Sequence, residues 1–183
     1  MNLRKKMSAR KNNKTFALFP IAFFVDSSPH VTHRQTTGYI RDGRAPIPES
    51  EATSRVMSAN KGKDTGPEMA LRMALREIGI PGYRLHWKKV PGRPDIAYPG
   101  RKVAVFIHGC FWHRCPHCDL PLPESHTDFW SKKFERNKKR DEEKIGGLET
   151  EGWKVLVIWE CEIKEDVLNC AERVKALIIE ARK

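Results

Sequence analysis

This 183-residue sequence lacks three features, and each absence excludes a class of protein. Its apolar run over residues 15–25 is about half as long as a membrane-spanning helix needs to be, and Pro20 interrupts it. No internal repeat is evident, which excludes a repeat architecture. The five cysteines are odd in number and three lie within nine residues, a poor basis for a disulfide framework. Metal ligation in a reducing cytoplasm fits these cysteines better.

The charge is large but unevenly distributed. A formal net charge of +11 favours a polyanionic partner. Residues 1–50 hold nine basic and three acidic side chains, whereas residues 51–183 hold 25 basic and 20 acidic ones. The part expected to fold is therefore only mildly basic, and charge alone fits nucleic-acid binding and a solvated Lys-rich surface equally well.

The first 56 residues differ from the rest of the sequence. A basic start and a short apolar run superficially resemble a secretory signal peptide, but no clean small-x-small cleavage site follows. Residues 26–56 are polar and have no clear period. We expect residues 1–56 to be a disordered or non-native N-terminal extension, with export as the alternative. Met57 is then a plausible natural start, and residues 57–183 form the folded domain.

The sequence after Ser58 predicts an α/β protein. Thr65 as N-cap, Pro67 in the first turn and Glu68 at the capping-box position predict a helix, which Gly79 ends. Strands are expected over residues 83–86, 95–98, 102–107 and 154–160, a charged helix over 128–150, and an amphipathic helix that includes 167–178. This order, α-β-β-β-α-β-α, predicts an α/β/α sandwich with a central mixed sheet.

Four cysteines have the spacing of a closed structural zinc site, for which four thiolates are a usual donor set. They are Cys110, Cys115, Cys118 and Cys161. The first three would hold the ion from one loop, and Cys161 would attach that loop to the end of a distant strand. His113 and His117 lie in the same loop, so either could replace a thiolate, and a cluster without metal is the remaining alternative. Cys170 is expected to be a small core residue.

A second set of candidates lies at two strand ends. Asp95 follows Pro91-Gly92-Arg93-Pro94 at the mouth of one strand, and the next strand ends at Ile107-His108-Gly109. A hairpin brings both ends to one edge of the sheet. Asp95 suits Mg²⁺, a cation that phosphodiester hydrolysis would use, and a backbone carbonyl of the second strand offers another oxygen. His108 and His113 are candidates for general acid or base.

Each of these residues also has a purely structural interpretation. Asp95 could cap a turn after Pro94, and His108 could be a buried, hydrogen-bonded core histidine. Glu68 could be only the capping-box partner of Thr65.

Aromatic and basic residues beside the cysteines suit contact with DNA. Phe111 and Trp112 are adjacent in the loop, and side chains of this kind can wedge between base pairs. Phe129 and Trp130 form a second pair, although helical spacing favours core packing there. The basic run over residues 132–140 suits phosphates, and its interspersed acids fit a solvated helix face equally well.

Taken together, these motifs resemble those of the very-short-patch (Vsr) mismatch repair endonucleases. They occur in the order typical of that family, from about Ser58 to Ile163, over more than half the chain. The matching strings are Lys63-Asp64-Thr65 with Pro67-Glu68, Pro91-Gly92-Arg93-Pro94-Asp95-Ile96, His108-Gly109-Cys110-Phe111-Trp112-His113, Phe129-Trp130, Asn137 before Arg140-Asp141, and Gly152-Trp153 leading to Trp159-Glu160-Cys161.

The resemblance implies a restriction-endonuclease-like fold and a Mg²⁺-dependent nick beside the thymine of a T:G mismatch, the product of 5-methylcytosine deamination. Asp95 and the carbonyl oxygen of Ile107 would ligate Mg²⁺, and His108 and His113 would act at the scissile phosphate. Glu68 would assist through the N-terminal helix. Structural Zn²⁺ would be held by Cys110, Cys115, Cys118 and Cys161. DNA would be contacted by Phe111, Trp112 and Trp130 at intercalating positions, and by Arg93 and Asn137.

The sequence departs from the pattern at two places. Family members often carry His where Cys115 stands, a substitution that zinc tolerates, and the N-terminal extension has no counterpart. As expected for this family, Ile107-His108-Gly109 replaces the acidic-x-Lys pair of the broader nuclease fold.

The resemblance also implies a monomer in the cytoplasm, associated with the nucleoid, which binds double-stranded DNA containing a T:G mismatch, contacts mismatch repair proteins and has no membrane partner. Two alternatives stay open. One is a restriction-system nuclease without mismatch preference, and the other is a noncatalytic zinc-stabilised DNA-binding module.

Overall fold

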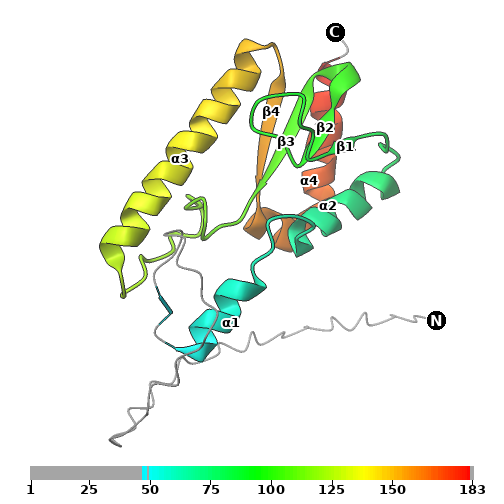
Figure 1. Cartoon of the computed structure of the whole chain (residues 1–183). Helices are drawn as coiled ribbons and strands as arrows, with labels where there is room; N and C mark the ends of the chain where they lie inside the picture. Colours follow the sequence, from blue (N-terminus) through cyan, green and yellow to red (C-terminus); the bar gives the residue numbers. More distant parts are fainter. Residues whose placement is uncertain (1–46, 49, 182–183) are drawn as a thin grey trace, which may run out of the picture. The chain divides into compact units, whose positions relative to one another are not determined.

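The computed structural model describes residues 47–48 and 50–181 (Figure 1). The expectation of disorder for residues 1–46 and 49 lies outside the described residues. Within them, no helix combines the length and the apolar character that crossing a membrane requires.

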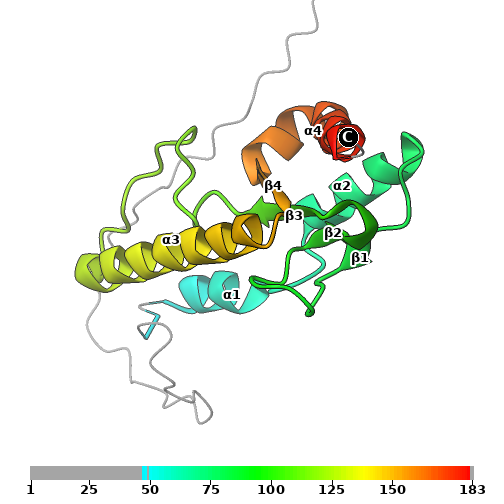
Figure 2. The same cartoon turned by 90° about the horizontal axis from the view of Figure 1, so that it is seen from above.

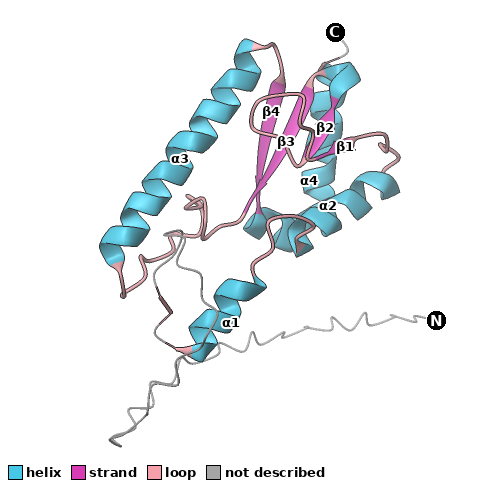
Figure 3. Cartoon of the chain, viewed as in Figure 1, coloured by secondary structure: helices cyan, strands magenta, loops and turns pink. Residues whose placement is uncertain are grey.

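The centre of the fold is a four-stranded mixed sheet (Figure 3). Its strands, in spatial order, are β1 (Arg84–Leu85), β2 (Ile96–Tyr98), β3 (Val103–His108) and β4 (Lys154–Trp159). β1 and β3 run antiparallel to β2, and β4 runs parallel to β3. Five of the six residues of β3 are buried, as expected for a central strand covered on both faces.

Two helices cover one face of the sheet, α2 (Gly66–Glu77) and α4 (Glu160–Glu180). The backbone N–H of Glu68 donates to the Thr65 hydroxyl that caps α2, and Gly79 follows the helix with a positive φ of 77°. Leu71 and Leu75 of α2 and Val174 of α4 pack against the strands and are fully buried. Burial of this apolar face stabilises both helices far more than their intrinsic propensity does.

The third long helix, α3 (Thr127–Thr150), lies on the opposite face (Figure 2). Leu148 near its end packs with Trp153 and with Phe106 of β3 in a second apolar cluster. The helix connects the parallel strands β3 and β4, which need a long crossover. Its inner face therefore passes over the end of β3.

The β2–β3 hairpin brings the candidate residues together. A short 3₁₀ helix, η1 (Pro99–Arg101), and Lys102 with a positive φ of 50° reverse the chain. Ile96 then pairs with Val105, which places the preceding Asp95 beside the end of β3. The expected meeting of the two strand ends is confirmed, because the Ile107 N–H donates to Asp95 Oδ2 at 2.8 Å.

The predicted order of helices and strands from Thr65 to the last helix is confirmed, with shifts of a few residues at the ends. Cys170 is buried in the core, as expected. The structure differs from the expectations at two points. Residues 51–59 form a helix, α1 (Glu51–Ala59), which overlaps the end of the supposed extension over residues 1–56. The last helix begins at Glu160, so Cys161 lies in its first turn rather than at the end of a strand. α1 buries no residue.

Candidate active site and metal centre

Asp95 lines a cavity at the end of β3. The cavity has a volume of about 240 Å³, and Glu68, His108, His113 and Lys144 also line it. Burial raises the pKa of the Asp95 carboxyl, the Ile107 N–H opposes that shift, and the nearby Glu68 adds to it. A half-buried carboxylate next to a second carboxylate is a favourable environment for a cation, because a positive ion relieves their repulsion.

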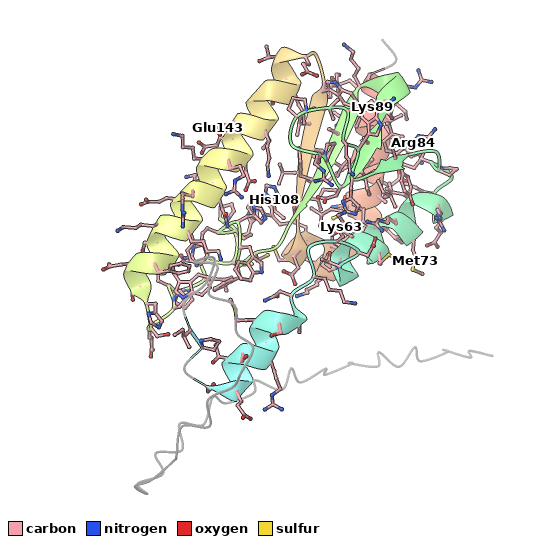
Figure 4. All side chains as sticks on the ribbon, viewed as in Figure 1. Lys63, Met73, Arg84, Lys89, His108 and Glu143 are labelled. Atoms are coloured by element: carbon pink, nitrogen blue, oxygen red, sulfur yellow. The ribbon has the colours of Figure 1, made fainter. Side chains whose placement is uncertain are left out.

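His108 and His113 lie face to face in this cavity. Their rings stack with centroids 4.0 Å apart and planes 9° from parallel. His108 is buried between α3 and the strands, where Figure 4 labels it, and the edge of Trp159 approaches it. Burial, and then the neighbouring His113, lower the pKa of His108 to about 4. His108 is therefore a neutral imidazole at neutral pH.

Asp141 of α3 completes the histidine pair, and sequence reasoning gave it no role. Its Oδ2 lies 2.5 Å from His113 Nδ1. Burial alone would raise the pKa of Asp141, but the hydrogen bond and charge of His113 outweigh burial and lower it. An ionised carboxylate only accepts, so His113 donates its Nδ1 proton to Asp141, and in the neutral form of the ring this leaves Nε2 as the acceptor.

A signal for Asp141 was present in the sequence. On α3 it follows Phe134 and Asn137 at helical spacing and precedes Leu148 by two turns, so it occupies the face that packs inward. An acidic residue in a buried stripe indicates a buried partner. The partner itself, His113, is 28 positions away and cannot be deduced from this helical spacing.

Glu68 is more than a helix cap. Its carboxylate accepts from the Asp64 N–H and from the Thr65 hydroxyl, and it is paired with the buried Arg72 at 2.6 Å. His86 stands between the two acids, with Nε2 3.5 Å from Glu68 and Nδ1 3.6 Å from Asp95. A continuous polar network therefore connects α2 to the start of β2. Sequence reasoning assigned no role to Arg72 or His86.

The expected DNA-contacting aromatic residues form one cluster with Phe134. Phe111 meets the rings of Trp112, Trp130 and Phe134 at centroid distances of 5.1 to 5.6 Å. Phe111 and Trp112 are half-buried, whereas Trp130 is buried. Lys133 Nζ lies 5.4 Å from the ring centroids of Trp112 and Trp130. The cluster begins one residue after Cys110, so its shape depends on the cysteine loop.

The two polar DNA candidates have different surroundings. Arg93 is exposed, has a positive φ of 52°, and lines the cavity with Asp95. The Asn137 amide donates to the Trp112 carbonyl oxygen at 3.0 Å. Asn137 therefore ties the aromatic loop to α3.

The four expected cysteines converge. All four sulfur atoms lie within 4.8 Å of one another, and Cys115 Sγ is 3.6 Å from Cys161 Sγ. Four thiolates around one zinc at Zn–S distances of about 2.3 Å are separated by roughly 3.8 Å, so this arrangement fits a zinc ion. Burial raises the pKa of the Cys110 and Cys161 thiols to about 11, and metal binding would release their protons.

Three neighbouring features define the limits of the cysteine cluster. All five cysteines of the chain are free thiols, and Cys170 lies outside the cluster. The four sulfurs form a complete donor set without His117, which is exposed. Glu160 Oε2 accepts from the Cys110 N–H at 3.4 Å and so links the loop to the start of α4.

Comparison with known proteins identifies the family. The model of the family described as DNA mismatch endonuclease Vsr matches residues 47–120. The chain is 44% identical over 110 residues to the type II nicking enzyme V.XorIIP of Xanthomonas oryzae pv. oryzae, which is 60% of this chain and 80% of the relative. It is 41% identical over 129 residues to the type II nicking enzyme V.NmeAIP of Neisseria meningitidis, which is 70% of this chain and 91% of the relative.

A relative named as a mismatch endonuclease supports the same assignment. The chain is 36% identical over 121 residues to the DNA mismatch endonuclease Vsr of Escherichia coli, which is 66% of this chain and 76% of the relative. The chain therefore belongs to the Vsr DNA mismatch endonuclease family and is a Vsr-like DNA endonuclease.

Proposed function

We propose that this endonuclease nicks one DNA strand beside the thymine of a T:G mismatch, by Mg²⁺-dependent hydrolysis of a phosphodiester, and so starts very-short-patch repair. The observation that carries the proposal is the convergence of Asp95, His108 and His113 in one cavity, with Asp141 hydrogen-bonded to His113. This is the set of groups that metal-assisted hydrolysis needs: a hard ligand for the cation and a base for water. The fold we propose is the restriction-endonuclease-like sandwich.

Asp95 and the carbonyl oxygen of Ile107 would hold the magnesium ion, with Glu68 assisting through the network around His86. One Asp95 oxygen is engaged by the Ile107 N–H, which fixes the carboxylate. When bound, Mg²⁺ would polarise the phosphate and neutralise its charge. The protein's own contribution is to orient the ligands and to keep two acids together in a partly buried cavity.

The two histidines would have different roles. His113 presents Nε2 as an acceptor because Asp141 holds its Nδ1 proton, so His113 would take the proton of the attacking water. His108 is neutral at neutral pH and stacks on His113, so it would position that ring and hydrogen-bond the phosphate.

Asp141→Asn tests the first of these roles. An asparagine cannot stabilise an imidazolium, so we expect the single-turnover nicking rate to fall by about 10²-fold or more, with little change in duplex affinity. Glu143→Gln, on the exposed outer side of the same helix (Figure 4), removes one carboxylate without touching the cavity and is the matched control. Equal rates for the two variants would contradict the role of Asp141.

The cysteine loop would present the DNA-contacting surface. Zn²⁺ would be bound by Cys110, Cys115, Cys118 and Cys161. The loop would then hold Phe111 and Trp112 where they wedge into the mismatch, and the buried Trp130 would pack behind them. Arg93 would contact phosphate at the cavity, and Asn137 would contact DNA while holding the loop. We further propose a monomer in the cytoplasm, associated with the nucleoid, that contacts mismatch repair proteins.

The mismatch preference is tested by rates on matched substrates. We expect a duplex with one T:G pair to be nicked at least about 10²-fold faster than the same duplex with T:A or C:G. The reason is that wedging side chains open a mismatched base pair at a lower free-energy cost than a Watson–Crick pair. Equal rates would support the alternative, a restriction-system nuclease without mismatch preference, which the similarity to the two type II nicking enzymes favours.

The third alternative, a noncatalytic zinc-stabilised DNA-binding module, predicts tight duplex binding and no cleavage with any divalent ion. Membership in an endonuclease family disfavours it. The same substrates decide it, because such a module would leave every strand intact.

A further inference from the structure

Lys144 of α3 is a cation beside the candidate active site that has no role in the proposed function. It lines the cavity that holds Asp95, His108 and His113. It also lines a second, adjoining hollow of about 470 Å³ with Arg93 and His86. Within the described part of the chain, the other cations of the two linings, Lys61, Lys63 and Arg93, are exposed, whereas the Lys144 side chain is 32% exposed. Lys144 is thus the cation most enclosed at the site.

The turn before β2 is built around this lysine. Gly92 has a φ of +74°, and a Cβ added to it would lie 2.8 Å from Lys144 Cβ and 3.0 Å from its Cγ. One helical turn further on, a Cβ added to Gly147 would lie 3.4 Å from Pro91 Cβ. The backbone of the turn that leads to Asp95 therefore packs directly on α3. This contact fixes the base of the Lys144 side chain next to the metal-ligand candidate.

The ammonium group is held by the acid that serves the proposed base. Lys144 Nζ lies 3.4 Å from Asp141 Oδ1, while the other oxygen of Asp141 accepts from His113. The lysine therefore lies beside the His113–Asp141 pair and in the wall of the cavity that holds Asp95. The end of β3, where the broader nuclease fold has an acidic-x-Lys pair, carries no lysine here, because its sequence is Ile107-His108-Gly109.

We propose that Lys144 is a catalytic residue whose ammonium group binds a non-bridging oxygen of the scissile phosphate. This inference rests on the proposed function. In the reaction the water oxygen bonds to phosphorus as His113 accepts the water proton. The P–O3′ bond breaks with its electron pair on the 3′ oxygen, which takes a proton from solvent. Lys144 keeps its protons and offsets the negative charge that grows on the phosphate oxygens.

The test compares two lysines with similar surroundings. Lys175 on α4 is 36% exposed and, like Lys144, pairs with an acid three residues earlier, Glu172. The variants are Lys144→Met and Lys175→Met, made in the full-length zinc-loaded protein. Two quantities are measured, the single-turnover nicking rate and the slope of log Kd for a duplex against log salt without added divalent cation. Far-UV circular dichroism and the Tm verify folding.

We expect Lys144→Met to lower the nicking rate by about 10²-fold, as loss of one transition-state donor does. The magnitude of its salt slope should fall by about 0.9, the change for one phosphate contact. Lys144→Arg, which keeps the charge, should retain more activity than Lys144→Met, and Lys175→Met should match the wild type in both quantities.

Each other outcome is decisive. A Lys144→Met rate within threefold of the wild type overturns the inference. A lower rate with an unchanged salt slope also overturns it, because the lysine then acts only through Asp141. If the wild type binds duplex without nicking it, the proposed function fails, and the salt slope still decides whether Lys144 contacts phosphate.

Discussion

Asp95→Ala is expected to lower the nicking rate by about 10³-fold or more, which corresponds to about 4 kcal/mol of lost transition-state stabilisation. The carboxylate is the candidate metal ligand just before the start of β2, and the cavity it lines contains one other carboxylate, Glu68, which is already paired with Arg72. Duplex affinity without divalent cation should remain or rise, because a negative charge is removed from beside the phosphate. Single-turnover kinetics and a Kd measurement check both statements.

A second substitution separates catalysis from folding. Asp95→Ala also leaves the Ile107 N–H without its acceptor, at a cost of about 1–3 kcal/mol. In Asp95→Asn the side-chain oxygen can still accept this hydrogen bond, so its Tm should stay close to that of the wild type while nicking is lost. An Asp95→Asn enzyme that nicks within tenfold of the wild type would refute Asp95 as the metal ligand.

Removal of zinc is expected to lower the Tm by about 10 °C or more. The cysteine cluster connects the loop after β3 to the first turn of α4, and metal binding of this kind contributes directly to folding. A decrease of about 4 kcal/mol in the free energy of unfolding corresponds to a Tm lower by roughly 8–16 °C for a domain of this size. Melting curves of the protein before and after chelation measure the shift.

Metal content gives the matched comparison. Cys118→Ala should leave well under one zinc per chain, whereas Cys170→Ala, which changes a buried cysteine outside the cluster, should keep one. Nicking should fall with zinc content, because Phe111 and Trp112 are carried by the same loop. An unchanged Tm after complete zinc removal would contradict the structural role of the cluster.

Local signals in the sequence predicted much of this architecture. Thr65, Pro67 and Glu68 predicted the start of α2, and the apolar strings of β3 and β4 predicted the two longest strands. The four cysteines were predicted as one donor set from spacing and softness, with His113 or His117 as a possible replacement for a thiolate, and the structure brings the four sulfurs together. Patterns of this kind succeed because capping, burial and ligation depend on residues close in sequence or on a distinctive residue type.

What could not be predicted depends on contacts between distant elements. Asp141 acquires a role only because α3 passes over His113, and Arg72 and His86 only because α2 packs beside β2. The sequence alone predicts Lys144 as a solvated helix residue, because the packing of Gly92 against it is a contact between distant parts of the chain. The Ser50 cap of α1 is a local signal that the sequence analysis did not use, and none of the side chains of this helix is buried.

In the proposed function, this site hydrolyses one phosphodiester beside a mismatched thymine. The most direct measurement uses a zinc-loaded wild-type enzyme, Mg²⁺ and a T:G duplex labelled separately on each strand, with products resolved to the nucleotide. The predicted result is a single break next to the mismatched thymine, an intact guanine strand, and no break when Mg²⁺ is left out. Cleavage of both strands, breaks scattered along the duplex, or no break with any divalent cation would contradict the claim.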